Sequence, residues 1–147
     1  MRARTLLLIA ALGIHGLAQA ADLRVSEAWV RGTVTGQKNS PAYMVFEAPR
    51  ATAIVGASSP RADKVELHEM QHPEGRDLMT MKRVERIEIP PGKPYKLIPL
   101  GSYIMLVGLK KGVDAGERIP ITLQIEQDGK RSEVVVQAEG RSFYPGK

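Results

Sequence analysis

The sequence contains no cysteine, and aromatic residues make up only 5% of its 147 residues. Without thiols the chain can neither form disulfide bonds nor offer thiolates to a metal, so histidine, methionine and carboxylates remain as possible ligands. Basic residues outnumber acidic ones by 21 to 16, but they are scattered singly or in pairs. Nucleic-acid binding needs a clustered basic face with stacking aromatics, so it is not expected here.

Long apolar runs are also missing, except near the start of the chain. A basic beginning with Arg2 and Arg4, an apolar stretch over residues 5–17 and the segment Ala18-Gln19-Ala20 are typical of a secretory signal peptide. The apolar stretch is shorter than the ~20 residues of a membrane span. We therefore expect a signal peptide over residues 1–20 and a periplasmic product without membrane insertion. Residues 21–147 have the length of a single domain.

Helical periodicity is absent after residue 21, whereas apolar residues recur with period two or in short β-branched runs. Turn-forming residues separate these runs, and Asp128-Gly129 is the clearest hairpin signal among them. Many short strands at this spacing predict an all-β fold, an antiparallel Greek-key β-sandwich. The predicted strands cover residues 23–31, 42–48, 52–58, 64–71, 77–84, 95–98, 103–109, 118–127 and 130–138.

Histidine and methionine are unevenly distributed. In the predicted mature chain the only histidines are His68 and His72. His72 lies in a predicted turn, where a solvated side chain is the simpler interpretation, although it could cover a bound metal. Four methionines fall close to His68 or on a neighbouring predicted strand, namely Met70, Met79, Met81 and Met105.

A hairpin would bring several of these side chains together. A tight turn centred between residues 74 and 75 places His68 opposite Met81 and Met70 opposite Met79, and opposed residues share one face of a sheet. Leu67 has the opposite parity and suits the core, so His68 and Met70 are expected on the outer face. One imidazole and several thioethers would then form one patch.

Thioether sulfur is a soft, neutral donor that favours Cu(I), whereas Ca²⁺ and Mg²⁺ prefer oxygen ligands. A patch of histidine and methionine therefore predicts a Cu(I) site. The alternative is that the methionines only fill gaps in a hydrophobic core, which is their common use in proteins.

The spacing of these residues resembles a known family, the periplasmic PCu(A)C copper chaperones. The segment His68-Glu69-Met70 is followed by residues 71–80, then Met81, residues 82–102 and Tyr103-Ile104-Met105. The family signature is a His-Met pair, a second Met and a final His-x-Met. This resemblance implies a cupredoxin-like sandwich that binds Cu(I) and supplies it to the copper A centre of cytochrome c oxidase. Its implied partners are a Sco-type protein and oxidase subunit II, and its implied ligands are His68, Met81 and Met105.

Tyr103 stands where the family has its second histidine. A phenol with a pKa near ~10 stays protonated at neutral pH and is a poor ligand for Cu(I). Three arrangements follow: a three-coordinate site of one histidine and two methionines, a site completed by Met70 or Met79, or the loss of tight copper binding.

Enzymatic activity is not expected, because no cysteine is present and the histidines lack a credible nucleophile arrangement. We expect a monomeric copper chaperone. The alternatives are a periplasmic copper buffer that serves copper tolerance, and a secreted β-sandwich interaction module that binds no metal.

Overall fold

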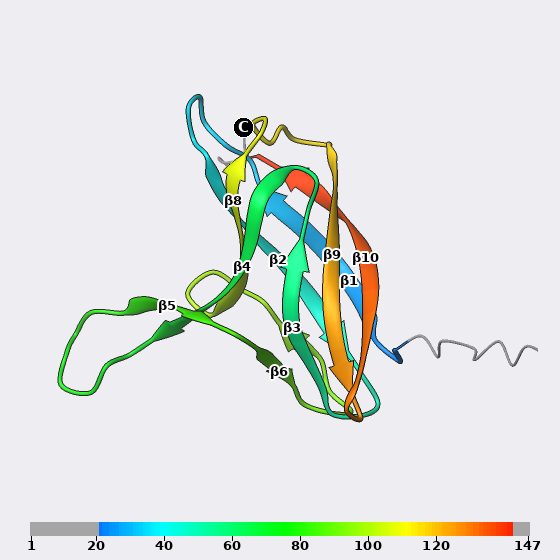
Figure 1. Ribbon diagram of the computed structural model, residues 1–147. Helices are drawn as coiled ribbons and strands as arrows, with labels where there is room; N and C mark the ends of the chain where they lie inside the picture. Colours follow the sequence, from blue (N-terminus) through cyan, green and yellow to red (C-terminus); the bar gives the residue numbers. More distant parts are fainter. Residues whose placement is uncertain (1–20, 143–147) are drawn as a thin grey trace, which may run out of the picture.

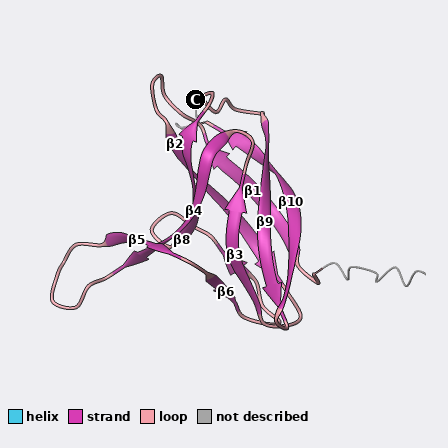
Figure 2. Ribbon diagram, viewed as in Figure 1, coloured by secondary structure: helices cyan, strands magenta, loops and turns pink. Residues whose placement is uncertain are grey.

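The computed structural model describes residues 21–142, and all regular structure in this part of the chain is β-strand (Figure 1, Figure 2). The predicted signal peptide, residues 1–20, lies outside the described residues. No helix within the described part is long and apolar enough to cross a membrane. The strands are β1 (Arg24–Arg31), β2 (Asn39–Glu47), β3 (Thr52–Ser58), β4 (Ala62–Gln71), β5 (Thr80–Val84), β6 (Ile87–Ile89), β7 (Tyr95–Lys96), β8 (Ser102–Leu109), β9 (Arg118–Gln127) and β10 (Lys130–Arg141).

The strands form one strongly curved sheet in the order β5-β4-β8-β2-β1-β10-β9-β3-β6, and β7 pairs with β2. The sheet folds over onto itself, so that β3 and β9 face β2 and β8 across the core (Figure 1). The predicted all-β, cupredoxin-like sandwich is confirmed. One pairing departs from the antiparallel pattern, because β1 runs parallel to β10 where Trp29 pairs with Glu139.

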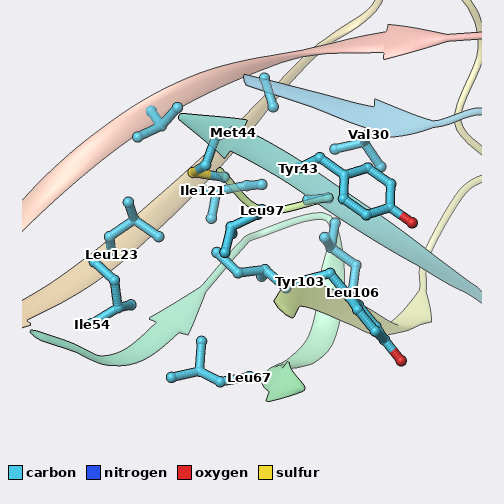
Figure 3. Close-up of a cluster of buried hydrophobic side chains, with 14 of the residues drawn as sticks. Val30, Tyr43, Met44, Ile54, Leu67, Leu97, Tyr103, Leu106, Ile121 and Leu123 are labelled. Atoms are coloured by element: carbon cyan, nitrogen blue, oxygen red, sulfur yellow. The ribbon is translucent and has the colours of Figure 1, made fainter. Parts of the chain in front are cut away.

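The core is supplied by alternate residues of strands that are buried on one face. In β9 the side chains of Ile119, Ile121, Leu123 and Ile125 are fully buried. Ile121 and Leu123 lie beside Met44 in the apolar cluster of Figure 3. Such alternation is what the period-two pattern of the sequence predicts.

The hairpin between β9 and β10 forms as predicted. Gln127 pairs with Lys130 across a two-residue turn, in which φ is 52° at Asp128 and 71° at Gly129. Positive φ at both central residues is the backbone of a type I′ turn, which Asp-Gly favours.

Strand boundaries agree with the expectation in some places and differ in others. The strands at 52–58 and 118–127 have the predicted limits. The short strand β6 was not predicted, because three residues are too few to show alternation. The strand expected at 77–84 begins only at Thr80, since residues 72–79 form an irregular loop.

Strand β5, the last residues of β4 and the loop between them form an arm that extends away from the body of the sandwich, whereas the rest of β4 pairs with β8 in the body (Figure 1). The predicted register of this hairpin is wrong. Met70 pairs with Met81 and His68 pairs with Arg83, a shift of two residues. The prediction assumed a tight turn, but pairing ends at Gln71 and Thr80 and a long loop leaves the register to the strands themselves. A shift of two keeps every side chain on its predicted face.

Candidate metal centre

Strand β4 separates its core side chains from its site side chains by alternation. Leu67 is 4% exposed and belongs to the hydrophobic core. His68, the next residue, lies on the opposite face, as predicted. Its side chain is nevertheless only 14% exposed, because the neighbouring strand covers it.

Tyr103 of β8 is the residue that covers His68. The two are direct partners across the β4–β8 ladder, and their ring centroids are 5.3 Å apart. The Tyr103 hydroxyl lies 3.4 Å from His68 Nδ1 and donates a hydrogen bond to Met81 Sδ on β5. Three strands therefore bring an imidazole nitrogen, a thioether sulfur and a phenol to one point.

Glu66 holds the other side of the His68 ring. Its carboxylate accepts a hydrogen bond from His68 Nε2 at 2.9 Å and forms a 2.8 Å ion pair with Lys64. The hydrogen bonds from Lys64 and then from His68 lower the pKa of Glu66 to about 2. A carboxylate can only accept, so the proton of a neutral His68 sits on Nε2 and the Nδ1 lone pair faces Tyr103 and Met81.

Sequence reasoning missed this role of Glu66. A signal was present, since residues two apart on a strand share a face and Glu66 stands two residues before His68.

Tyr103 is 4% exposed, and burial raises the pKa of its phenol. It belongs to a row of rings, with Tyr43 at 6.4 Å and then Trp29 at 4.7 Å from Tyr43, and both tyrosines are part of the buried apolar cluster. Figure 3 shows the hydroxyls of Tyr43 and Tyr103 pointing away from the apolar cluster. Trp29 is only partly buried and lies in this row beneath the Arg141 guanidinium, 5.3 Å from the ring centre.

The remaining predicted ligands are three methionines, which lie on β8, on β4 and in the loop before β5. Met105 is two residues along β8 from Tyr103, directly across from Glu66, and is partly buried against the core. Met70 is the direct partner of Met81. Met79 lies beyond the last residue pair of the arm, in the same loop as His72.

The donor set of this region is unusual. Met81 is 58% exposed and Met79 is 38% exposed, so neither is a buried gap filler. Within residues 21–142, no group of three or more His, Cys, Asp and Glu side chains is placed to hold a metal ion. The exposed methionine sulfurs beside His68 are donors that favour a soft ion.

Comparison with solved structures defines the fold as that of PCuAC domains. A copper-bound PCuAC domain from PmoF2 superposes with a TM-score of 0.66 at 23% sequence identity, over 83% of this chain and 94% of that one. The apo solution structure of DR1885 from Deinococcus radiodurans matches with a TM-score of 0.62 at 28% identity, over 100% and 97% of the two chains. The CuI form of DR1885 matches with a TM-score of 0.60 at 27% identity, over 89% and 85%.

Within that fold, the family is given by sequence. The model of the LpqE-like family, described as "Putative lipoprotein LpqE-like", matches residues 23–138, and the chain belongs to this family. A relative from Leifsonia xyli subsp. xyli (strain CTCB07), "Putative lipoprotein Lxx21020", is 35% identical over 118 residues, which are 80% of this chain and 70% of the relative.

Proposed function

We propose that this protein is an exported copper chaperone that binds one Cu(I) between β4, β5 and β8. The observation that carries the proposal is the convergence of His68 Nδ1 and Met81 Sδ on one hydroxyl group, that of Tyr103. Two soft or borderline donors from different strands already face the same small volume. Copper-bound structures among the neighbours of the same fold support this choice of metal.

The ligands proposed for Cu(I) are His68 through Nδ1, Met81 and Met105. Glu66 acts through His68, because its hydrogen bond to Nε2 keeps the proton away from the nitrogen that would bind copper. Met70, paired with Met81, is the nearest further sulfur in the ladder. Tyr103 covers the metal without binding it, since a buried phenol with a raised pKa stays neutral.

All of these ligands are neutral. Binding therefore requires no deprotonation of a thiol, and it changes the net charge of the site only by the charge of the copper ion. A thioether site also survives in an oxidising compartment, where thiols form disulfides. These properties suit a protein that takes up Cu(I) outside the cytoplasm and gives it up to a partner. The proposed recipient is the copper A centre of cytochrome c oxidase subunit II, alone or with a Sco-type protein. The lipoprotein description of the relatives is consistent with a place in the cell envelope.

A competition titration tests the metal site. The exported protein is titrated with Cu(I) against a colorimetric chelator, and Met81→Leu, which keeps the side-chain volume but removes the sulfur, should weaken binding at least tenfold, about 1.4 kcal/mol. His68→Ala should do the same. Met44→Leu is the matched control, because Met44 is buried in the core and its loss should leave copper affinity unchanged. A wild-type protein that takes up no Cu(I) would contradict the proposal.

A second experiment separates a chaperone from a copper buffer, which would use the same site. Cytochrome c oxidase activity is measured in a deletion strain under copper limitation and after complementation with wild-type protein or Met81→Leu. A chaperone predicts lost oxidase activity that only the wild type restores. A buffer predicts normal oxidase activity and reduced copper tolerance.

A further inference from the structure

The arm carries a second pair of donors one step beyond the proposed site. Pairing between β4 and β5 ends at Gln71 and Thr80, and the next residues outward are His72 and Met79. Pro73 follows His72, and a residue before proline is held in an extended conformation. His72 and Met79 therefore flank the open end of the ladder, one position beyond its last residue pair on each side.

Both side chains of this outer pair, His72 and Met79, are exposed, and the exposed fraction of Met79 is 38%. In the part of the chain that the structure describes, neither side chain makes a hydrogen bond or an ion pair. A methionine on a protruding arm fills no gap in a core, so its packing role is small.

The chemistry of the pair matches that of the inner site. One imidazole and one thioether are both neutral and both bind Cu(I). The Glu74 and Asp77 carboxylates of the same loop do not convert the pair into a site for a hard cation, because no cluster of three His, Cys, Asp or Glu side chains suitable for a metal exists within residues 21–142. A soft monovalent ion is therefore the ligand that fits.

We infer that His72 and Met79 form an outer Cu(I) site, through which copper enters and leaves the inner site of His68 and Met81. The inference rests on the proposed function. Met81 of the inner site and its ladder partner Met70 are each two residues along their strand from the outer pair, so the two sites lie close together on the arm.

Transfer along the arm is a ligand exchange. Bonds from copper to His72 and Met79 break as bonds to Met81 and His68 form, and copper remains Cu(I) throughout. No electron moves, and no proton moves when His72 is neutral. Because the outer pair offers only two donors to the ion, it should bind more weakly than the inner site, as a point of entry and release must.

The experiment is a Cu(I) titration followed by NMR of methyl-¹³C-labelled methionines in the exported protein. The expected result is two steps: the first equivalent shifts the Met81 methyl, and the second, at least tenfold weaker, shifts the Met79 methyl. His72→Ala, which keeps the Met79 methyl as the reporter, should abolish the second step and leave the first unchanged. Met44→Leu, far from the arm in the core, should retain both steps.

Failure of this inference and failure of the proposed function give different spectra. If Met81 shifts and Met79 does not move through two equivalents, the outer site is absent and the inner site stands. The same conclusion follows if Met79 and Met81 shift together in one saturating step, or if His72→Ala leaves the Met79 step intact. If neither methyl shifts, the proposed copper site itself is wrong and the outer site falls with it.

Discussion

The two hairpins β9–β10 and β4–β5 are made of the same kind of strand, but they place their side chains in opposite environments. Strand β9 buries alternate isoleucine and leucine side chains completely, and its ladder with β10 runs from the Asp128-Gly129 turn to Arg118. Within residues 21–142, strand β5 pairs only with β4, and four of its five residues, Thr80 to Arg83, are exposed.

The two hairpins therefore have different roles: β9–β10 stabilises the fold, and the arm carries the proposed binding residues. The β9–β10 hairpin contributes the apolar surface that holds the sandwich together, because buried area drives folding. The arm contributes little buried area, so its side chains are free to be chosen for what they bind. Methionine serves both purposes in this protein: Met81 is exposed on the arm, and Met44 is buried in the core.

Breaking the body hairpin should have the largest effect. Ile121→Ala removes a fully buried side chain from the centre of β9 and should lower the free energy of unfolding by about 3–4 kcal/mol. Met81→Ala in the arm should change it by less than about 0.5 kcal/mol, because Met81 is largely exposed. Urea unfolding followed by circular dichroism measures both. Similar losses for the two variants would mean that the arm is part of the cooperative core.

The same division explains which features could be predicted from the sequence. Burial of one face produces an alternating pattern, so β9 and the outward direction of His68 could be predicted. The Asp128-Gly129 turn also determines its own register. In the arm no tight turn sets the register, so the pairing of Met70 with Met81 could not be predicted. The contact between Tyr103 and His68 depends on a strand more than thirty residues away, which local patterns do not reveal.

Tyr103 contacts Met81 of the arm and Tyr43 of the body, so replacing it tests how the two regions meet at the proposed metal site. Tyr103→His replaces the phenol beside His68 and Met81 with an imidazole, which binds both Cu(I) and Cu(II). Cu(I) affinity should rise at least tenfold, about 1.4 kcal/mol, and Cu(II) binding should become measurable. Chelator competition for Cu(I) and absorption spectroscopy for Cu(II) check these outcomes.

Tyr103→Phe is the control for that substitution. It keeps the ring that packs against Tyr43 and removes only the hydroxyl. Copper affinity should stay within about threefold of the wild type, because the phenol oxygen is not a ligand. If Tyr103→His alters neither metal's affinity although it folds, Tyr103 does not border the metal site.

The glycines of the two connecting loops provide a matched pair with a smaller effect. Gly129 and Gly75 both have positive φ, 71° and 76°, and neither has an atom close to where a Cβ would lie. Alanine at either position strains the backbone by about 1 kcal/mol. Gly129→Ala should appear as that loss of global stability, since its turn begins the β9 ladder. Gly75→Ala should leave global unfolding unchanged and alter only hydrogen exchange of the arm amides.

The smallest effect is expected at the start of β4, the end of the strand away from the arm. Glu117, just before β9, forms ion pairs with Arg61, just before β4, and with Lys111, and it accepts a hydrogen bond from the Asp114 backbone N–H at 2.9 Å. The Asp114 N–H first, and then Lys111, lower the pKa of Glu117 from 4.5 to about 2. A lowered folded-state pKa stabilises the protein above pH 4.5, and this contribution disappears as the pH falls toward 2.

Glu117→Gln should therefore lower stability at pH 7 by about 1 kcal/mol, a value reduced by solvent screening. The difference from the wild type should shrink between pH 4.5 and about 2, where the wild-type carboxyl becomes neutral as well. Urea unfolding at pH 7, 4.5 and 3 measures it. Glu133→Gln is the control, because Glu133 is exposed on β10 and has no ion-pair partner within residues 21–142. A loss for Glu117→Gln that stays constant with pH would mean that packing around the side chain, rather than its charge, ties the start of β4 to the body.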